Sequence, residues 1–223
     1  MRMRRKKNLE KRLDNCEYNL INVGEIPKNA QLAVQEKHYL DYQALFGNSN
    51  PVELEIGCGK GKFIIETAIE NPDINYIAIE KYDNVIVQAC EKAEQEKITN
   101  LKFMNIGAEY LERYLKSGSI RKIYLNFSCP YPKKSYANRR LTNKRFLKIY
   151  EALLSSEGEI YQKTDNQGLF EYSIEQFSQY GYCLKNVSLD LHKSDFLGNV
   201  ETEYEHKFSS LGKPIYRLEA YLR

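Results

Sequence analysis

The pattern of apolar and polar positions changes at about residue 51, where two regular periods begin. Short segments in which apolar residues cluster, each interrupted by polar side chains, predict buried, parallel-type strands at 52–56, 74–80, 101–106, 121–127 and 159–163. Segments with apolar residues at helical spacing lie at 62–70, 83–97, 109–116, 142–155 and 168–180. Two further strands, expected at 183–191 and 215–222, suit an antiparallel addition. This alternation predicts an α/β fold with a parallel sheet and crossover helices.

The remaining segments have no clear period. Residues 1–12 predict a flexible basic arm. Within 13–50, residues 39–46 predict a helix or a turn, and a loop signal follows at 47–51. The stretch 193–213 is polar and predicts a loop. We therefore expect a basic N-terminal arm and extension over 1–50 and one folded domain over 51–223, a size that suits a single core.

A glycine-rich turn, Gly57-Cys58-Gly59-Lys60-Gly61, follows the first strand directly and precedes a helix. Glycines allow a tight turn and bring backbone N–H groups close to a ligand. The spacing differs from the dinucleotide fingerprint G-x-G-x-x-G, because Lys62 stands where the third glycine belongs. An ordinary strand-to-helix turn is the alternative interpretation.

Two acids favour a cofactor site over that alternative. Glu55 directly precedes the loop, where a carboxylate suits a ligand with a cationic centre and an amino group better than a pyrophosphate. Glu80 ends the second strand, 21 residues after Gly59, and an acid at this separation reaches ribose hydroxyls. Together they indicate S-adenosylmethionine as the ligand.

Ligands of an open parallel sheet bind beyond the carboxyl ends of its strands, so the other strand ends matter too. After the third strand, residues 105–109 offer backbone and side-chain groups for an adenine edge. After the fourth, Tyr131 lies between two prolines, and this stiff ledge suits stacking against a base. The alternative is a proline-rich loop whose tyrosine packs on the core. After the fifth lies Lys163-Thr164-Asp165-Asn166.

The cysteines are five in number, widely scattered, and without zinc spacing, which predicts a reduced, cytoplasmic protein without a metal site. Cys129, at the fourth strand end, could be a nucleophile that forms a thiolate adduct with a pyrimidine. We favour a small loop residue, because no neighbouring base would activate the thiol. No apolar run approaches the ~20 residues of a membrane span, and the basic N-terminus lacks the apolar stretch of a secretory signal.

Charge is unevenly distributed along the chain. The net charge is only +3, yet residues 1–12 contain seven basic side chains and one acid, and residues 133–148 contain seven basic side chains and no acid. Solvated basic surfaces are the ordinary explanation for such runs. Two concentrated basic segments on an acidic background instead favour a polyanionic partner such as nucleic acid.

Three acids between Glu201 and Glu205 are unusual in a protein that meets a polyanion. Thr202 and Glu205 have the spacing of a capping box, which would make them a solvated helix start. Alternatively, Glu205 and Asp165 accept hydrogen bonds from N1 and N2 of a guanine. The spacing alone leaves both interpretations open.

These residues carry a resemblance to the bacterial tRNA (guanine-N7-)-methyltransferases. The resemblance covers nearly all of 51–223. The matching pieces are 53–61, 71–80, 124–128, 132–134, 139–141, 163–166 and 202–205, and Met1–Arg4 also fits. The resemblance implies a Rossmann-like class I methyltransferase fold, with a seven-stranded, mostly parallel sheet and helices on both faces. It implies methylation of N7 of the variable-loop guanosine of tRNA with S-adenosyl-L-methionine, by a monomer or a homodimer.

The resemblance also assigns roles to individual residues. The cofactor would be bound by Glu55, Gly57, Gly59, Glu80, Gly107 and Cys129. The tRNA guanosine would be bound by Lys133, Asp165, Thr202, Glu203, Tyr204 and Glu205. Two of these positions depart from the family pattern: Cys129 stands where the family has its active-site aspartate in Asp-Pro-Trp-Pro, and Gly107 stands where it has an acid.

The departures at Cys129 and Gly107 keep two other functions open. Guanine N7 carries no proton, so its methylation needs positioning and no general base, and this favours an active enzyme with an altered pocket. An RNA methyltransferase acting on an adenine or cytosine amino group is the second possibility, since Ser128-Cys129-Pro130-Tyr131 partly matches the signature of such enzymes. An RNA-binding protein with this fold but impaired cofactor binding is the third.

Overall fold

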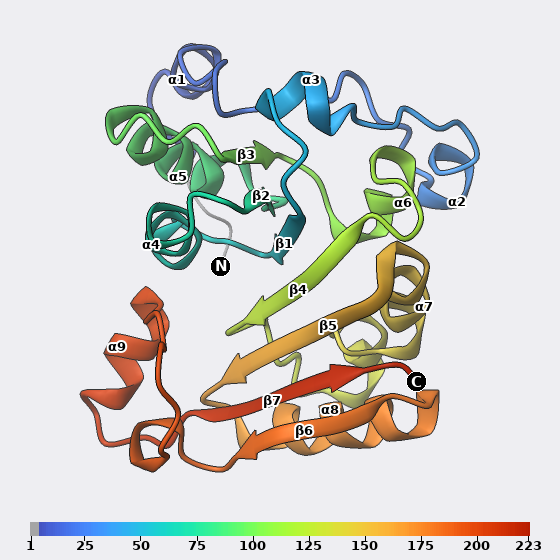
Figure 1. The fold of residues 1–223 in the computed structure, drawn as a ribbon, viewed down its shortest axis with the longest axis vertical. Coiled ribbons are helices and arrows are strands. Elements are labelled where there is room, and N and C mark those ends of the chain that lie inside the picture. The colour runs from blue at the N-terminus through green and yellow to red at the C-terminus, as the bar shows by residue number, and fades with distance from the viewer. Residues whose placement is uncertain (1–4) are drawn as a thin grey trace. The chain divides into compact units, whose positions relative to one another are not determined.

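The structure of this protein, a computed structural model, describes residues 5–223. The chain divides into two compact units, residues 1–115 and 116–223, and each unit combines strands with helices (Figure 1). None of the helices within residues 5–223 has the length and apolar character needed to cross a bilayer.

Three parallel strands form the sheet of the first unit. They are β1 (Val52–Ile56), β2 (Asn75–Ile79) and β3 (Leu101–Met104), in the order β3-β2-β1. Every residue of all three strands is buried, as expected for parallel strands covered on both faces. Ile56 pairs with Ile79, and Ile79 pairs with Met104, so the three strands end level with one another.

Helices of the first unit flank this sheet. The helices α4 (Lys62–Glu70) and α5 (Asp83–Gln95) pack on each other and against β3, and α4 also packs against β2. The short helices η1 (Ala108–Tyr110) and α6 (Leu111–Tyr114) follow β3. The helix α4 ends at Glu70, two residues before Pro72, because Asn71, the residue that precedes the proline, disfavours helical geometry.

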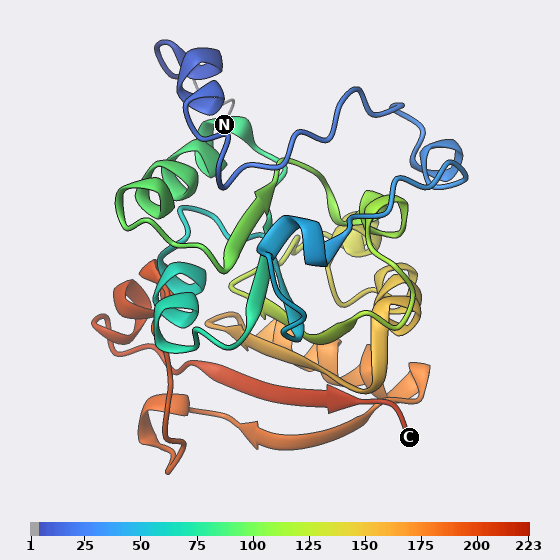
Figure 2. The same ribbon diagram turned by 45° about the horizontal axis from the view of Figure 1, so that its top comes forward.

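The N-terminal segment is more ordered than the sequence predicts. It forms α1 (Leu9–Asp14) and α2 (Ala30–Ala33), which the sequence does not predict, and α3 (Tyr42–Phe46), which lies where the sequence predicts a helix or a turn. Figures 1 and 2 both show α1 beside α5, where Leu9 is buried and Arg12 donates two hydrogen bonds to Glu91, at 2.6 and 2.7 Å. The expected flexible arm over 1–12 is therefore wrong for residues 9–12, and its first four residues lie outside the described part of the chain.

The second unit contains four strands, in the order β4-β5-β7-β6. β4 (Ile120–Asn126) is parallel to β5 (Leu154–Thr164), whereas β7 (Tyr216–Tyr221) is antiparallel to both β5 and β6 (Cys183–Ser188). This confirms the predicted antiparallel addition. The helices are η2 (Lys134–Arg139), α7 (Lys144–Leu153), α8 (Gln167–Tyr180), η3 (Leu191–Lys193) and α9 (Glu203–Ser209).

Local capping explains several boundaries in the second unit. The Asn166 side chain accepts a hydrogen bond from the N–H of Leu169 at the start of α8, and Gly181 ends that helix with a left-handed φ of +105°. The helix α9 lies inside the stretch that the sequence predicted as a loop. It begins because the Thr202 hydroxyl accepts the N–H of Glu205 at 2.9 Å.

Candidate active site

The glycine-rich turn joins β1 to α4 at the level end of the three strands. Gly57 and Gly59 have φ values of +82° and +59°. This is the left-handed region of backbone conformation, which residues other than glycine rarely adopt. The N–H groups of Gly57 and Cys58 donate to the Ile79 carbonyl, at 2.8 and 3.1 Å, and this anchors the turn to the end of β2. A Cβ on Gly61 would lie 2.7 Å from the Ala89 Cβ, so this glycine lets α4 approach α5 closely.

Two carboxylates surround this turn. Glu55 is only 2% exposed at the end of β1, and Glu80 is half-buried directly after β2. The pKa of the Cys58 thiol is raised well above its usual range, first by burial and then by the charges of Glu55 and Glu80. Burial and the two negative charges therefore both favour the protonated thiol of Cys58.

The end of β3 lies next to the end of β2. The Asn105 side chain donates to the Glu80 carbonyl at 2.8 Å, and the Glu80 N–H reaches the Met104 carbonyl at 3.3 Å. Gly107 follows, just before η1. The structure thus brings the turn, Glu80 and Gly107 to one edge of the first unit, as the strand-end argument predicts.

The loop after β4 is stiffened by hydrogen bonds as well as by its prolines. Arg140 donates to the carbonyls of Pro130 and Tyr131, both at 3.0 Å, and Tyr131 has a left-handed φ of +42°. Cys129 lies exposed on this loop. Beside it the Ser128 hydroxyl oxygen is buried, and no hydrogen-bond partner for it occurs within residues 5–223. The loop therefore holds one exposed thiol and one sequestered hydroxyl in a fixed backbone.

Three aromatic rings gather where β4 ends and α9 begins. Phe127 stacks on Tyr204 and Phe208 with centroid distances of 6.4 and 6.3 Å, and those two rings stack on each other at 6.2 Å. Tyr204 is 56% exposed. Lys213 lies 4.7 Å from the Phe208 ring centroid and 3.7 Å from Asp165. The predicted residues Asp165 and Tyr204 are therefore linked through this aromatic cluster.

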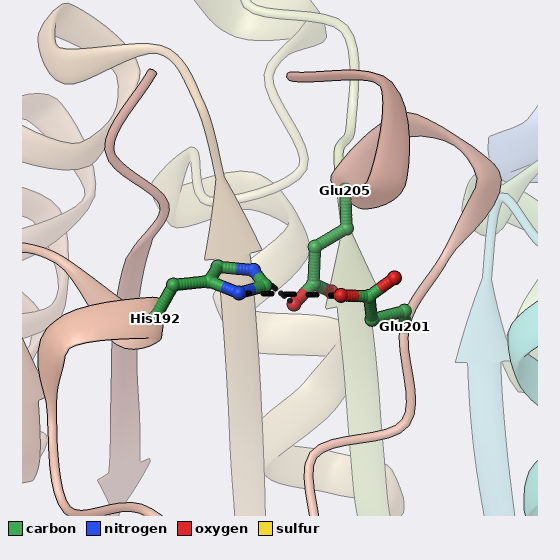
Figure 3. Close-up of side chains that lie close together, drawn as sticks. All are labelled: His192, Glu201 and Glu205. Carbon is green, nitrogen blue, oxygen red and sulfur yellow. Dashed lines mark hydrogen bonds and ion pairs between the residues drawn. The ribbon is translucent and has the colours of Figure 1, made fainter. Parts of the chain in front are cut away.

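Glu205 is fully buried and its carboxylate is fully engaged. Oε2 accepts from Lys163 Nζ at 2.6 Å, while Oε1 accepts from Asn199 at 2.5 Å and lies 3.1 Å from His192 Nε2 (Figure 3). The predicted cap is confirmed, because the Thr202 hydroxyl caps α9, but the predicted solvated helix start is wrong, because Thr202 and Glu205 are both buried. In this geometry Glu205 holds α9 to β5, and its contact with a base stays a prediction.

His192, Glu201 and Glu205 also lie close enough to share a metal ion, since one ligand atom of each falls within 4.8 Å of the others (Figure 3). The ammonium of Lys163 already neutralises Glu205 at 2.6 Å. A divalent cation would have to bind beside that charge. We therefore assign the cluster a structural role.

The remaining predicted substrate residues are Lys133 and Glu203. Lys133 is exposed and precedes η2, in the basic segment 133–148. Glu203 is half-buried in the first turn of α9. The roles of Lys133 and Glu203 in substrate binding stay predictions.

Comparison with known proteins identifies the family. A family model described as a putative methyltransferase matches residues 49–218. The tRNA (guanine-N(7)-)-methyltransferase of Bacillus licheniformis is 50% identical over 87% of this chain and 92% of its own length. That of a Geobacillus strain is 54% identical over 82% of this chain and 84% of its own length. The chain belongs to the tRNA (guanine-N(7)-)-methyltransferase family.

A solved structure shows the fold of this family member. The 16S rRNA methyltransferase KamB superposes with a TM-score of 0.61, at 16% identity, over 82% of this chain and 93% of its own. The seven strands, ordered 3-2-1 in the first unit and 4-5-7-6 in the second, match the predicted class I methyltransferase fold. The predicted fold class is confirmed.

Sequence reasoning missed several residues that shape the site of this methyltransferase. The sequence pattern marks Lys163 only as part of a strand end, and it indicates no role for Phe127 or Phe208. Phe208 follows Tyr204 by four residues, a spacing that places two side chains on one helix face. That signal would have indicated the aromatic cluster once α9 was recognised as a helix.

Proposed function

We propose that this protein transfers a methyl group from S-adenosyl-L-methionine to N7 of a guanine in tRNA. The observation that carries the proposal is the glycine-rich turn with carboxylates at successive strand ends, in a chain 50–54% identical to tRNA (guanine-N(7)-)-methyltransferases. The variable-loop guanosine is the target that the family resemblance suggests.

The first unit has the groups that this cofactor needs. Glu55 suits the amino and sulfonium end, the Gly57–Gly59 backbone allows close approach, and Glu80 suits the ribose hydroxyls. When bound, the cofactor supplies an electrophilic methyl group on its sulfonium. In the second unit, Cys129 stands at the position of the family's aspartate, and we propose that it contributes shape rather than charge.

The acceptor atom explains why no proton-abstracting residue is required. N7 of guanine is a lone pair in the plane of the base, so the protein must position the base and exclude water. Tyr204, Phe127 and Phe208 offer a ring surface for the base, and Asp165 offers an acceptor for its N–H groups. We propose that the thiol of Cys129 forms no covalent adduct.

The basic segments suit the phosphates of tRNA. Lys133 and Lys134 are exposed, as are Lys7 and Lys11 in the N-terminal segment. Replacing Lys7 and Lys11 with alanine should weaken tRNA binding and reduce the slope of log K against log salt by about one per lost phosphate contact. An unchanged slope would show that these two lysines do not contact phosphate.

Nucleoside analysis tests the central proposal. Unmodified tRNA is incubated with the protein and cofactor, digested, and examined by mass spectrometry for the methylated base. N7-methylguanosine above the no-enzyme control, lost in Glu55→Ala, is the expected result. A methylated adenine or cytosine amino group would instead support the second function left open by the sequence.

The change at Cys129 and Gly107 also motivates the non-enzymatic alternative, an RNA-binding protein with impaired cofactor binding. Calorimetry with S-adenosylmethionine separates the two, because heat of binding at millimolar cofactor is expected only for the enzyme. The division into an N-terminal extension over 1–50 and a methyltransferase domain over 51–223 stays a prediction. So do cytoplasmic location, a monomeric or homodimeric state, and the absence of a metal.

A further inference from the structure

Gly107 leaves a space that the side chain of Glu109 fills. A Cβ built on Gly107 would lie 2.5 and 2.9 Å from the two carboxylate oxygens of Glu109 and 2.7 Å from its carboxylate carbon. Side-chain carbons do not approach other atoms so closely, so any larger residue at 107 would displace the Glu109 carboxylate. The glycine therefore permits the position that this carboxylate occupies.

The local backbone brings the two residues together. Gly107 has an extended conformation with φ −84° and ψ 157°, and the short helix η1 begins directly after it. The N–H of Tyr110 closes the turn on the Gly107 carbonyl at 3.1 Å. Ala108 is buried at 5% exposure, which fixes the turn against the unit, while Glu109 remains half-buried and reachable by a ligand.

This carboxylate belongs to the same edge as Glu80. β2 and β3 are neighbouring parallel strands, and Asn105 ties the end of β3 to the Glu80 carbonyl at 2.8 Å. The glycine-rich turn is tied to the end of β2 on its other side. Adjacent strands lie about 4.8 Å apart, so turn, Glu80 and Gly107 follow one another over about 10 Å, a span comparable to an adenosine.

We propose that Glu109 accepts a hydrogen bond from the 6-amino group of the cofactor's adenine. The inference rests on the proposed function, in which Glu80 binds the ribose. A base attached to that ribose extends toward the next strand end, where Glu109 is the carboxylate. Its charge suits an amino donor, and a charged partner strengthens such a hydrogen bond. Glu109 would then favour the adenosine cofactor over an analogue in which inosine, without the 6-amino group, replaces adenosine.

Calorimetry with S-adenosylhomocysteine tests this assignment without measuring catalysis. Glu109→Ala should raise the Kd roughly tenfold to a hundredfold, the range expected for a charge-assisted hydrogen bond. The matched control is Glu112→Ala, which removes a half-buried acid three residues further along the same segment and should leave the Kd unchanged.

An analogue and a relocated carboxylate sharpen the test. The inosine analogue lacks the amino group, so it should bind the wild-type protein weakly and lose nothing further in Glu109→Ala. The double variant Gly107→Asp/Glu109→Ala should recover most of the affinity for S-adenosylhomocysteine, because a Cβ at 107 lies 2.7 Å from where the Glu109 carboxylate carbon lies.

The outcomes separate this inference from the proposed function. If the wild-type protein binds S-adenosylhomocysteine and Glu109→Ala binds it equally well, the adenine assignment is wrong and the proposed function stands. If the wild-type protein itself does not bind, the proposed function fails. Circular dichroism of each variant checks that a loss of affinity is not a loss of fold.

Discussion

Replacing Glu205 with alanine should destabilise the protein by about 3 kcal/mol. The carboxylate is 0% exposed and Lys163 is 8% exposed, so the variant leaves a buried ammonium without its counter-charge. Removing one partner of a buried ion pair costs about 3–5 kcal/mol. We expect the lower end, because Lys163 also donates to the Val200 carbonyl at 2.8 Å and to Asn199 at 3.0 Å.

Denaturation in guanidinium chloride, followed by circular dichroism, measures this loss as a change in the free energy of unfolding. The matched control is Glu203→Ala, which removes the same charge from the same helix at a half-buried position and should cost less than about 1 kcal/mol. A loss below 1 kcal/mol in Glu205→Ala, equal to that of the control, would refute the structural role assigned to the pair.

The double variant Lys163→Met/Glu205→Leu separates folding from recognition. Well-packed apolar residues replace buried ion pairs at little cost, so most of the lost stability should return. If methyl transfer to tRNA returns with it, Glu205 acts only by holding α9 to β5. If the double variant is stable and inactive, Glu205 also contacts the base, and the purely structural interpretation is wrong.

Three further predictions concern single side chains. Gly61→Ala should lower the free energy of unfolding, measured in urea, by about 2–4 kcal/mol, and Gly57→Ala by only about 1–2 kcal/mol. Both glycines have φ +82°, but only a Cβ at 61 would lie 2.7 Å from the Ala89 Cβ. Equal losses in the two variants would contradict this reasoning. Ser128→Ala should leave the free energy of unfolding within about 1 kcal/mol while lowering the methylation rate, since its buried hydroxyl has no partner within residues 5–223; unchanged methylation would exclude a role. Maleimide at pH 8 should label Cys129 first and spare Cys58, whose raised pKa keeps the thiol protonated and whose burial excludes the reagent, as peptide mass spectrometry before and after denaturation would show.

The sequence predicted the elements whose causes are local. The strand β1 alternates three apolar residues with two glutamates, and the glycines that follow it adopt the left-handed conformations that the turn requires. The end of α4 before Pro72 depends on neighbouring residues alone, as does the Asn166 cap of α8 that the structure adds. Such features need no knowledge of distant contacts.

Other elements depend on partners far along the chain. Residues 13–50 have no period, yet Asn19 is fully buried because its amide donates to the carbonyls of Ile98 and Leu101, both at 2.8 Å. The helix α9 is similar, since Lys163 lies 42 residues before the carboxylate that it binds. Spacing alone could not show that Glu205 is engaged in this way, so capping and base recognition were equally compatible with it.

Guanine N7, the acceptor atom, places a particular requirement on the residues that position the cofactor and the base. A reaction at a bare nitrogen lone pair depends on alignment, and small displacements of donor or acceptor cost rate. Three residues make contacts that position neighbouring elements. Arg140 donates hydrogen bonds to the loop after β4, Lys163 binds Glu205 of α9, and Gly61 allows α4 to approach α5 closely. Cys129 and Gly107 stand where the family resemblance implies acids, but guanine N7 carries no proton that such acids would have to accept. Sensitivity to substitution should therefore follow these positioning contacts rather than the thiol at 129.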